Sequence, residues 1–249
     1  MSSVSPYTLK FSINSVVRAI ELLWNQRKLV SKKWRYHMNA KAFYENNILK
    51  LTLEDDGLHT SQIEAAFYKK QDKIYIKEYQ GHISKAEQII KNFNRLMPDA
   101  FDKGDWENAL LKFARICKES GIIWFLTGSA CDAVRGIDVI PHDLDIEIFS
   151  KHWNKAQEVL SDYIVEPFIE TNGWARDHFG RIVVEKTLVD VVADEKFDFP
   201  NYAYEPFEWR GYTLWLEPFM SRYNIERQRE RLDRIEAFDK YIALRMGDI

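Results

Sequence analysis

The chain has 249 residues, of which 46% are hydrophobic, and its formal net charge at pH 7 is −3. This composition is typical of a packed globular protein of one or two domains and excludes a largely disordered chain. The near-neutral charge argues against a broad nucleic-acid-binding surface, although a local basic groove stays compatible with it.

The cysteine count and the lengths of the apolar runs disfavour several further classes of protein. The two cysteines, Cys117 and Cys131, provide neither a disulfide framework nor zinc-ligand spacing. No apolar run approaches the length of a membrane span, and the first residues lack the apolar centre of a signal peptide. We therefore expect a cytoplasmic protein with no membrane partner, while its oligomeric state is left open.

Residues 1–83 predict a small α+β module whose role the residues do not indicate. Residues 16–23 have helical spacing, whereas residues 48–53 and 74–79 alternate apolar and polar side chains, as strands do. A wall of the substrate site, a dimerisation element and an added scaffold are all compatible with this pattern.

Two helices are predicted next. The segment beginning at Ser84 has a capping-box pattern, with Glu87 three residues later, and helical apolar spacing follows until Pro98. The second helix begins near Asp105, ends before Gly121 and leads into an apolar strand. The catalytic core is expected to span residues 84–200.

A strand, a tight turn and a short helix are predicted between residues 122 and 135. Residues 122–126 are β-branched and aromatic, which is typical of a buried strand. Gly128 lacks a Cβ, so the backbone can turn sharply there and approach a ligand closely. Ser129 is the expected N-cap of a helix over residues 130–135. The free N–H groups of such a helix end form a phosphate-binding site, so we expect Gly128 and Ser129 to bind phosphate.

A second strand carries two aspartates, Asp143 and Asp145, which alternate with aliphatic residues. Alternation places both carboxylates on one face of the strand. Two like charges on an apolar strand are costly to desolvate and call for a cation. Mg²⁺ is expected because it takes one or two carboxylates together with substrate phosphates. Glu147 continues the same face and is either a further metal ligand or, as we expect, a side chain that points to solvent.

A third acid, Asp190, lies within an otherwise aliphatic strand at residues 188–192. It is interpreted as a metal ligand or general base. Arg135 is a candidate phosphate ligand, although a cation also suits the C-terminal end of its helix. Arg181 is clustered with Arg176 and His178, and this cluster is a candidate site for triphosphate or acceptor.

The last part, residues 201–249, predicts a hairpin at Arg210-Gly211 and a helical tail that opens at Glu217-Pro218. Arginines alternate with acidic residues along the tail between residues 226 and 236. Such alternation is typical of a solvated helix face.

Taken together, these motifs resemble the nucleotidyltransferase superfamily with a DNA polymerase β-type catalytic core. The similarity rests on Leu126-Thr127-Gly128-Ser129, on Asp143-x-Asp145 in the next strand and on Asp190 in a later one. In length and layout the chain is similar to the small-molecule adenylyltransferases that act on aminoglycoside and lincosamide antibiotics. The loop before Asp143 also resembles that of phosphocholine/fukutin-type transferases, but the longer acidic run of that group is absent.

The resemblance implies an α+β fold: a small mixed sheet with helices on one side, preceded by the N-terminal module and followed by the helical tail. It implies that Asp143, Asp145 and Asp190 bind Mg²⁺ and that ATP or another NTP is the donor. A nucleoside monophosphate would be transferred to a hydroxyl of a small-molecule acceptor. Two alternatives stay open: a transferase with a CDP-linked donor, and a non-catalytic nucleotide-binding or toxin–antitoxin-like interaction protein.

Overall fold

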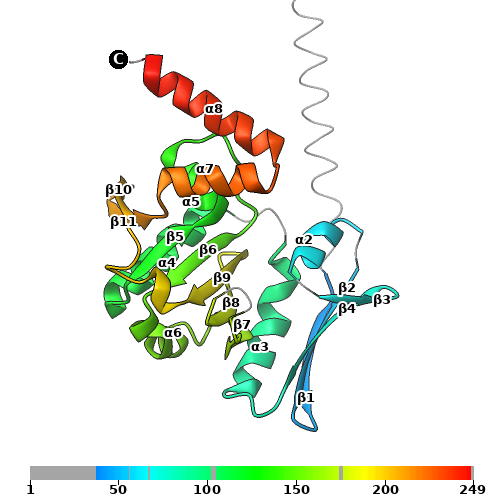
Figure 1. Cartoon of the computed structure of the whole chain (residues 1–249). Helices are drawn as coiled ribbons and strands as arrows, with labels where there is room; N and C mark the ends of the chain where they lie inside the picture. The colour runs from blue at the N-terminus through cyan, green and yellow to red at the C-terminus, as the bar shows by residue number, and fades with distance from the viewer. Residues whose placement is uncertain (1–37, 56, 67, 102–104, 174–175, 248–249) are drawn as a thin grey trace, which may run out of the picture. The chain divides into compact units, whose positions relative to one another are not determined.

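The protein has an α+β fold, as the sequence predicts. The computed structural model describes residues 38–55, 57–66, 68–101, 105–173 and 176–247, which all belong to one compact unit, Met38–Ile249. Within these ranges the chain forms a four-stranded and a seven-stranded sheet, with helices packed against them (Figure 1). The helix predicted at residues 16–23 lies outside the described residues.

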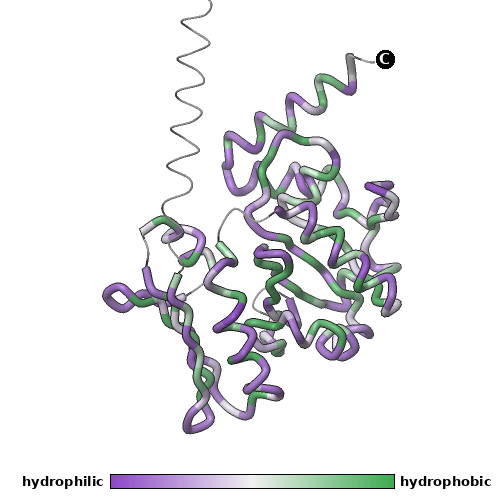
Figure 2. Tube along the Cα trace, turned by 180° about the vertical axis from the view of Figure 1, so that it is seen from behind, coloured by the Kyte–Doolittle hydropathy of each residue, from purple (hydrophilic) through white to green (hydrophobic). Residues whose placement is uncertain are grey.

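The four-stranded sheet is antiparallel, with the strand order β1-β2-β4-β3. Its elements are β1 (Ala40–Glu45), β2 (Ile48–Glu54), helix α2 (Thr60–Ala65), β3 (Lys69–Gln71) and β4 (Ile74–Gln80). The β1–β2 turn places Asn46 and Asn47 at φ 51° and 60°, the conformation that a two-residue hairpin turn requires. Hairpin tips are hydrophilic and strand interiors more apolar (Figure 2). The strands predicted at residues 48–53 and 74–79 are confirmed.

Helix α3 (Ala86–Leu96) packs against both β1 and β7, so it links the two sheets. The predicted helix is therefore present, but the capping box is wrong. The N-cap is Lys85, which has φ 58° and makes no side-chain cap bond, and Ser84 lies outside the helix. Pro98 lies in a 3₁₀ turn that ends the helix, as its missing N–H predicts.

The seven-stranded sheet has the order β10-β11-β5-β6-β9-β8-β7. Its strands are β5 (Trp124–Thr127), β6 (Leu144–Ile148), β7 (Ile164–Glu170), β8 (His178–Val184), β9 (Thr187–Ala193), β10 (Glu205–Trp209) and β11 (Tyr212–Leu216). Strands β6 and β9 are parallel neighbours, whereas β8 and β9 form an antiparallel hairpin. This order places the strand of the aspartate pair directly beside the strand of the third acid.

Helices α4 (Trp106–Ser120) and α6 (Trp153–Val159) pack against this sheet through aromatic side chains. Phe113 meets Trp124 edge-on with ring centroids 5.1 Å apart, and Trp153 stacks on Phe168 at 4.5 Å. The α4 cap follows the sequence closely, because Asp105 accepts a bond from the Asn108 N–H and Gly121 ends the helix at φ 64°.

The C-terminal hairpin leads into two helices, α7 (Phe219–Gln228) and α8 (Leu232–Gly247). A short turn separates them. The N–H of Arg231 donates to the carbonyl of Glu226, and the N–H of Glu230, at φ 53°, donates to that of Arg227. This pairing is a Schellman motif, which stops α7 and changes the direction of the chain.

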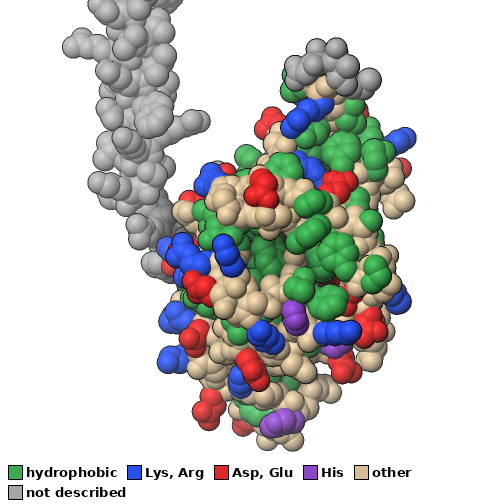
Figure 3. Space-filling view, turned by 90° about the vertical axis from the view of Figure 1, so that its left-hand side faces the viewer, with side chains coloured by type: hydrophobic (Ala, Val, Ile, Leu, Met, Phe, Trp, Pro, Cys, Tyr) green, Lys and Arg blue, Asp and Glu red, His purple; other side chains and the backbone are tan. Residues whose placement is uncertain are grey.

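Charged side chains of both signs are interspersed with hydrophobic ones on the molecular face shown in Figure 3. No helix of the described residues has both the length and the apolar character needed to cross a membrane. The division of the chain at residues 83 and 200 stays a prediction.

Candidate functional site

The corner between β5 and helix α5 (Gly128–Arg135) holds the glycine turn that the sequence predicts. Gly128 has φ 65°, and a Cβ built on it would lie only 1.8 Å from Oδ2 of Asp145. Both the backbone conformation and the lack of space therefore require glycine. The N-cap is Thr127 instead of the expected Ser129, because α5 begins one residue before Ser129.

The pairing of β6 with β9 brings the three predicted acids together. Asp145 lies opposite Asp190 in the register of the parallel strands, and Asp143 immediately precedes β6. Burial raises the pKa of Asp143 above its ordinary value, and the negative charge of Asp190 raises it further. Asp143 and Asp145 line one cavity, together with Leu188 at the start of the strand of Asp190, whereas Asp190 itself is not part of the lining.

Asp145 is the most strongly perturbed of these acids. Burial raises its pKa to about 8, with further contributions from the charges of Asp143 and Asp190, while Arg222 and Arg229 act in the opposite sense. A carboxylate with such a pKa is short of positive charge in its surroundings. The site therefore favours a proton or a bound cation at Asp145.

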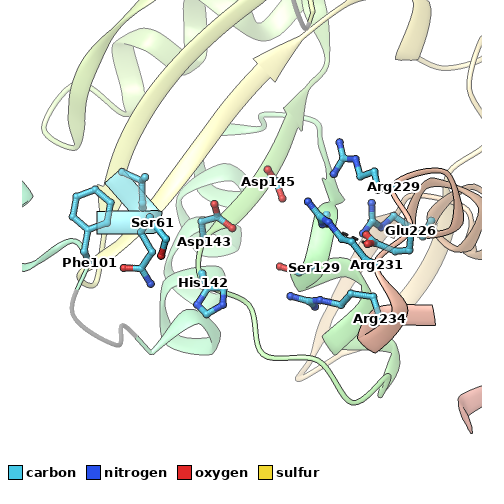
Figure 4. Close-up of a pocket in the computed structure, with 14 residues that line it drawn as sticks. Ser61, Phe101, Ser129, His142, Asp143, Asp145, Glu226, Arg229, Arg231 and Arg234 are labelled. Atoms are coloured by element: carbon cyan, nitrogen blue, oxygen red, sulfur yellow. Dashed lines mark hydrogen bonds and ion pairs between the residues drawn. The ribbon is translucent and has the colours of Figure 1, made fainter. Parts of the chain in front are cut away.

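The cavity in front of these aspartates has a volume of about 430 Å³ (Figure 4). Its acidic side consists of Asp143 and Asp145, with Gly128 and Ser129 from the β5–α5 corner. Helix α2 and the end of the α3 region contribute the remaining lining on one side: Ser61, Gln62 and Phe101. His142 points into the same space beside Asp143.

Four arginines line the side of the cavity opposite the acids; we call them the arginine wall. They come from α7, from the turn after it and from the first turn of α8: Arg222, Arg229, Arg231 and Arg234. In Figure 4 the last three lie across the cavity from Asp143 and Asp145. Glu226 lies among them and pairs with Arg222 and Arg231, so this side still has more guanidinium groups than carboxylates. A cavity that is acidic on one side and mainly basic on the other suits a ligand that carries both anionic groups and a metal ion.

The members of the arginine wall differ in their partners. Arg222 is buried and holds Asp132 through two hydrogen bonds of 3.1 and 2.8 Å, so its charge is compensated. Arg231 lies 3.4 Å from a carboxylate oxygen of Glu226. Among the described residues, Arg229 has no ion pair, and Nη1 of Arg234 is buried without a hydrogen-bond partner. The wall therefore has uncompensated positive charge that faces the cavity.

The sequence pattern favours a solvated helix face for Arg229, Arg231 and Arg234, with a nucleotide contact by one of the tail arginines as the alternative, and it does not single out Arg222. Arg229 and Arg231 are exposed, as a solvated face implies, but the chain does not continue as one helix through them. Together with Arg234 they line the cavity. A non-glycine residue, Glu230, occupies the left-handed position of the turn, so no glycine or proline marked the break.

Arg135 does not reach the cavity, which corrects its expected contact with phosphate. Its side chain is buried at the far end of α5, where Nη2 pairs with Glu205 at 2.7 Å and also donates to the carbonyl of Glu217. Nη1 lies 2.7 Å from Sγ of Cys131. Arg135 therefore ties α5 to the C-terminal hairpin.

Arg181 also lies outside the cavity lining, which corrects the expectation that it binds triphosphate or acceptor. It is 2% exposed and donates to both oxygens of Asp190, from Nε at 2.5 Å and from Nη2 at 3.0 Å. Nη1 is directed to Glu166, which lies away from the cavity. Arg181 thus lies behind the acids and orients one of them.

Glu147 is buried instead of pointing to solvent as expected. Burial raises its pKa to about 7, although Arg176, 3.2 Å away, acts to lower it. His178, the third member of the predicted cluster, packs beside the ring of Trp153 at 5.1 Å. Glu147 is buried, whereas Arg176 and His178 are partly exposed, and none of the three lines the cavity described above.

The acids of the site supply only part of the coordination shell of a magnesium ion. Among the side chains that the structure describes, no three His, Cys, Asp or Glu residues form a ready-made metal cage. Asp190 is engaged by Arg181, which leaves the carboxylates of Asp143 and Asp145 open to the cavity. Two hard oxygen donors match the usual protein contribution to Mg²⁺, which takes its other ligands from water and substrate phosphates.

No family model and no curated protein matches the chain. A solved structure of a Thermotoga maritima protein, described as a "putative nucleotidyltransferase", is similar to it, with 18% identity and a TM-score of 0.44. The match covers 56% of this chain and 93% of that one. At this identity and TM-score, the likeness does not bear on the reaction, the metal or the substrates of this chain.

Proposed function

We propose that the protein is a Mg²⁺-dependent nucleotidyltransferase that transfers a nucleoside monophosphate from ATP or another NTP to a hydroxyl of a small-molecule acceptor. The observation that carries the proposal is the juxtaposition of two partly buried aspartates and the arginine wall across one cavity. Burial and the charges of Asp143 and Asp190 raise the pKa of Asp145, so a cation would stabilise its ionised form, and the unpartnered Nη1 of Arg234 can donate to an anion. A nucleoside triphosphate with Mg²⁺ satisfies both sides at once.

Each residue of the site would have a distinct role in this reaction. Asp143 and Asp145 would hold Mg²⁺, which neutralises charge that develops on the phosphates. The N–H groups at Gly128 and Ser129 and the arginines opposite would bind the β- and γ-phosphates. The acceptor oxygen would attack the α-phosphorus, the bond from that phosphorus to the bridging oxygen would break, and pyrophosphate would leave. Asp190, oriented by Arg181, would accept the proton of the acceptor hydroxyl.

Space for an acceptor adjoins the cavity. A second cavity of about 600 Å³ shares Gln62, Phe101, His142 and Arg234 with the first. Its other side is largely apolar, with Trp106, Val139, Ile140 and Pro141. An acceptor with an apolar or aromatic part would fit there and present a hydroxyl towards the phosphate site.

The proposal is tested by a pyrophosphate-release screen with each of the four NTPs and Mg²⁺, with antibiotic and tRNA acceptors. We expect release with at least one acceptor, and loss of release in Asp143→Asn and Asp145→Asn variants that keep their fold. Turnover in either variant equal to that of the parent would reject the assigned roles. Turnover of CDP-choline without pyrophosphate release would favour the CDP-linked alternative. NTP binding without turnover would favour the non-catalytic one.

A further inference from the structure

A buried charged cluster lies behind the catalytic acids, where the two sheets meet. Its centre is Glu166 on β7, which is fully buried. Oε1 accepts hydrogen bonds from Tyr68 at 2.6 Å and from Nη1 of Arg181 at 3.1 Å. Oε2 accepts from Lys77 at 2.6 Å and from the hydroxyl of Tyr79. Both carboxylate oxygens of Glu166 are thus fully used.

The cluster joins two parts of the structure. On one side, Lys77 and Tyr79 lie on β4 of the four-stranded sheet, and Tyr68 lies just before β3 of the same sheet. On the other side, Glu166 and Arg181 belong to the seven-stranded sheet. Arg181 also donates to the carbonyl of Ala66 at 2.9 Å, at the end of α2. Since α2 carries Ser61 and Gln62 into the cavity, the same cluster anchors one side of that cavity.

Arg181 lies between the cluster and the site. Its Nε and Nη2 hold both oxygens of Asp190, while Nη1 is held by Glu166 and Ala66. The planar guanidinium makes these bonds in a fixed fork, so the direction of one set constrains the other. A displacement of Glu166 would therefore rotate the guanidinium plane of Arg181 and with it the carboxylate of Asp190.

The charges in this cluster are balanced, which is needed for ions in the interior. Burial alone would raise the pKa of Glu166, but Arg181 and Lys77 outweigh it and hold the pKa at about 2. Buried ion pairs contribute little net stability compared with apolar packing, whereas they fix geometry well. A cluster of this kind is better suited to fixing the position of Arg181 than to adding stability.

We propose that Glu166 is a positioning residue: by holding Arg181 it fixes the carboxylate of Asp190, so the four-stranded sheet supports the reactive site. The catalytic part of this inference rests on the proposed function. The physical part, coupling between Glu166 and Asp190 through Arg181, does not, because the two carboxylates share a partner whatever reaction the site performs.

The coupling is tested without any activity by a double-mutant cycle of Glu166→Gln and Asp190→Asn, with urea unfolding of the full-length protein as the readout. We expect the unfolding constant of the double variant to differ by about tenfold from the product of the two single effects. Agreement with that product within about twofold would overturn the proposal. If Glu166→Gln does not fold, Tyr79→Phe, which keeps all charges, takes its place in the cycle, and the same two outcomes decide.

Catalysis provides the second test, at a temperature where circular dichroism shows every variant to be fully folded. We expect Glu166→Gln to lower kcat by about tenfold or more with KM for the NTP nearly unchanged, and Glu166→Asp to restore part of the loss. Lys112→Met, which removes the surface ion pair with Glu185, is the control and keeps the parental kcat. A fully folded Glu166→Gln protein with parental kcat would show that Glu166 is only structural. A parent without turnover would reject the proposed function, whereas the unfolding cycle would still decide the coupling.

Discussion

Oδ2 of Asp145 occupies the space that a side chain on Gly128 would need, since an added Cβ would lie 1.8 Å from it. Asp145 lies on β6, which is antiparallel to β5, and Gly128 is the first residue of α5, at the corner where β5 ends. The phosphate-binding turn and the metal-binding carboxylate that we propose are therefore in direct contact. Neither can move without the other.

A Gly128→Ala substitution is expected to lower both the stability of the fold and kcat, for two different reasons. The left-handed conformation at Gly128 costs an alanine about 1–2 kcal/mol of stability. The added methyl group must also displace Asp145, and a displacement of about 1 Å is enough to lower kcat by roughly 100-fold. Thermal unfolding and pyrophosphate release measure the two effects separately.

Gly136→Ala is the matched control. Gly136 ends the same helix at φ 91°, but no atom lies within 4 Å of the position of its Cβ. We expect a similar loss of stability without the loss of kcat. Equal kcat losses in both variants would show that contact with Asp145 is unimportant.

An Asp145→Asn protein should be more stable than the parent in metal-free buffer, and more so as the pH rises. The folded-state pKa of Asp145 is about 8 against an ordinary value of 3.8, so the folded protein holds this proton more tightly than the unfolded chain. The corresponding stability is complete below pH 4 and is lost as the pH rises towards 8. Asparagine never ionises and avoids that loss, which we expect to amount to about 1 kcal/mol or more at pH 8.

Melting temperatures of the two proteins from pH 5 to pH 8 in the presence of EDTA test this expectation. The difference between variant and parent should widen steadily with pH. A difference that is independent of pH would show that Asp145 ionises normally in the folded protein.

Magnesium binding should release a proton near neutral pH. Because the pKa of Asp145 is about 8 without metal, this carboxyl is mostly protonated at pH 7, and the ion must displace the proton. The apparent affinity for Mg²⁺ should rise by up to about tenfold per pH unit between pH 6 and 7. Calorimetric titration in two buffers of different ionisation enthalpy counts the protons released. The same heat in both buffers would contradict the expectation.

Removing Arg234 is expected to weaken nucleotide binding without harm to the fold. Its buried Nη1 has no hydrogen-bond partner among the described residues, so truncation breaks no bond of the unliganded protein. A charge-assisted bond to phosphate is worth about 1.5–3 kcal/mol, so Arg234→Ala should raise KM for the NTP by about tenfold or more. Steady-state kinetics and thermal unfolding measure both parts.

Arg227→Ala is the control for that change. Arg227 is exposed on α7, lies 5.7 Å from the ring of Tyr223 and does not line the cavity. We expect its KM for the NTP to stay within about twofold of the parent. An equal rise of KM in both variants would point to a general effect of surface charge instead of the arginine wall.

The parts of the site that were predictable from sequence are those whose signals are local. Gly128 follows an apolar strand directly, and Asp143 and Asp145 alternate with aliphatic residues within one strand. Asp190 was recognisable because a single acid interrupts an aliphatic strand. Each of these signals depends on strand periodicity and turn chemistry, which neighbouring residues alone determine.

The parts that were not predictable depend on contacts between distant segments. Arg181 and Arg135 have the composition of phosphate ligands, but the partners that engage them, Glu166 and Glu205, lie on other strands. Helix α2 has six residues, too few for a helical period to show. The turn that places Arg229 and Arg231 beside the cavity carries no glycine, so its sequence resembles the middle of a helix.

The arginine side of the cavity depends on the length of the turn between α7 and α8 as well as on the presence of the arginines. Only residues 229–231 separate the two helices, and Phe238 on α8 packs against Phe219 and Tyr223 of α7. One extra residue in this connection would rotate α8 by about 100° about its axis. Arg234 and Phe238 would then both leave their places, and a chain with an unchanged set of arginines would present a differently charged opening to its substrate.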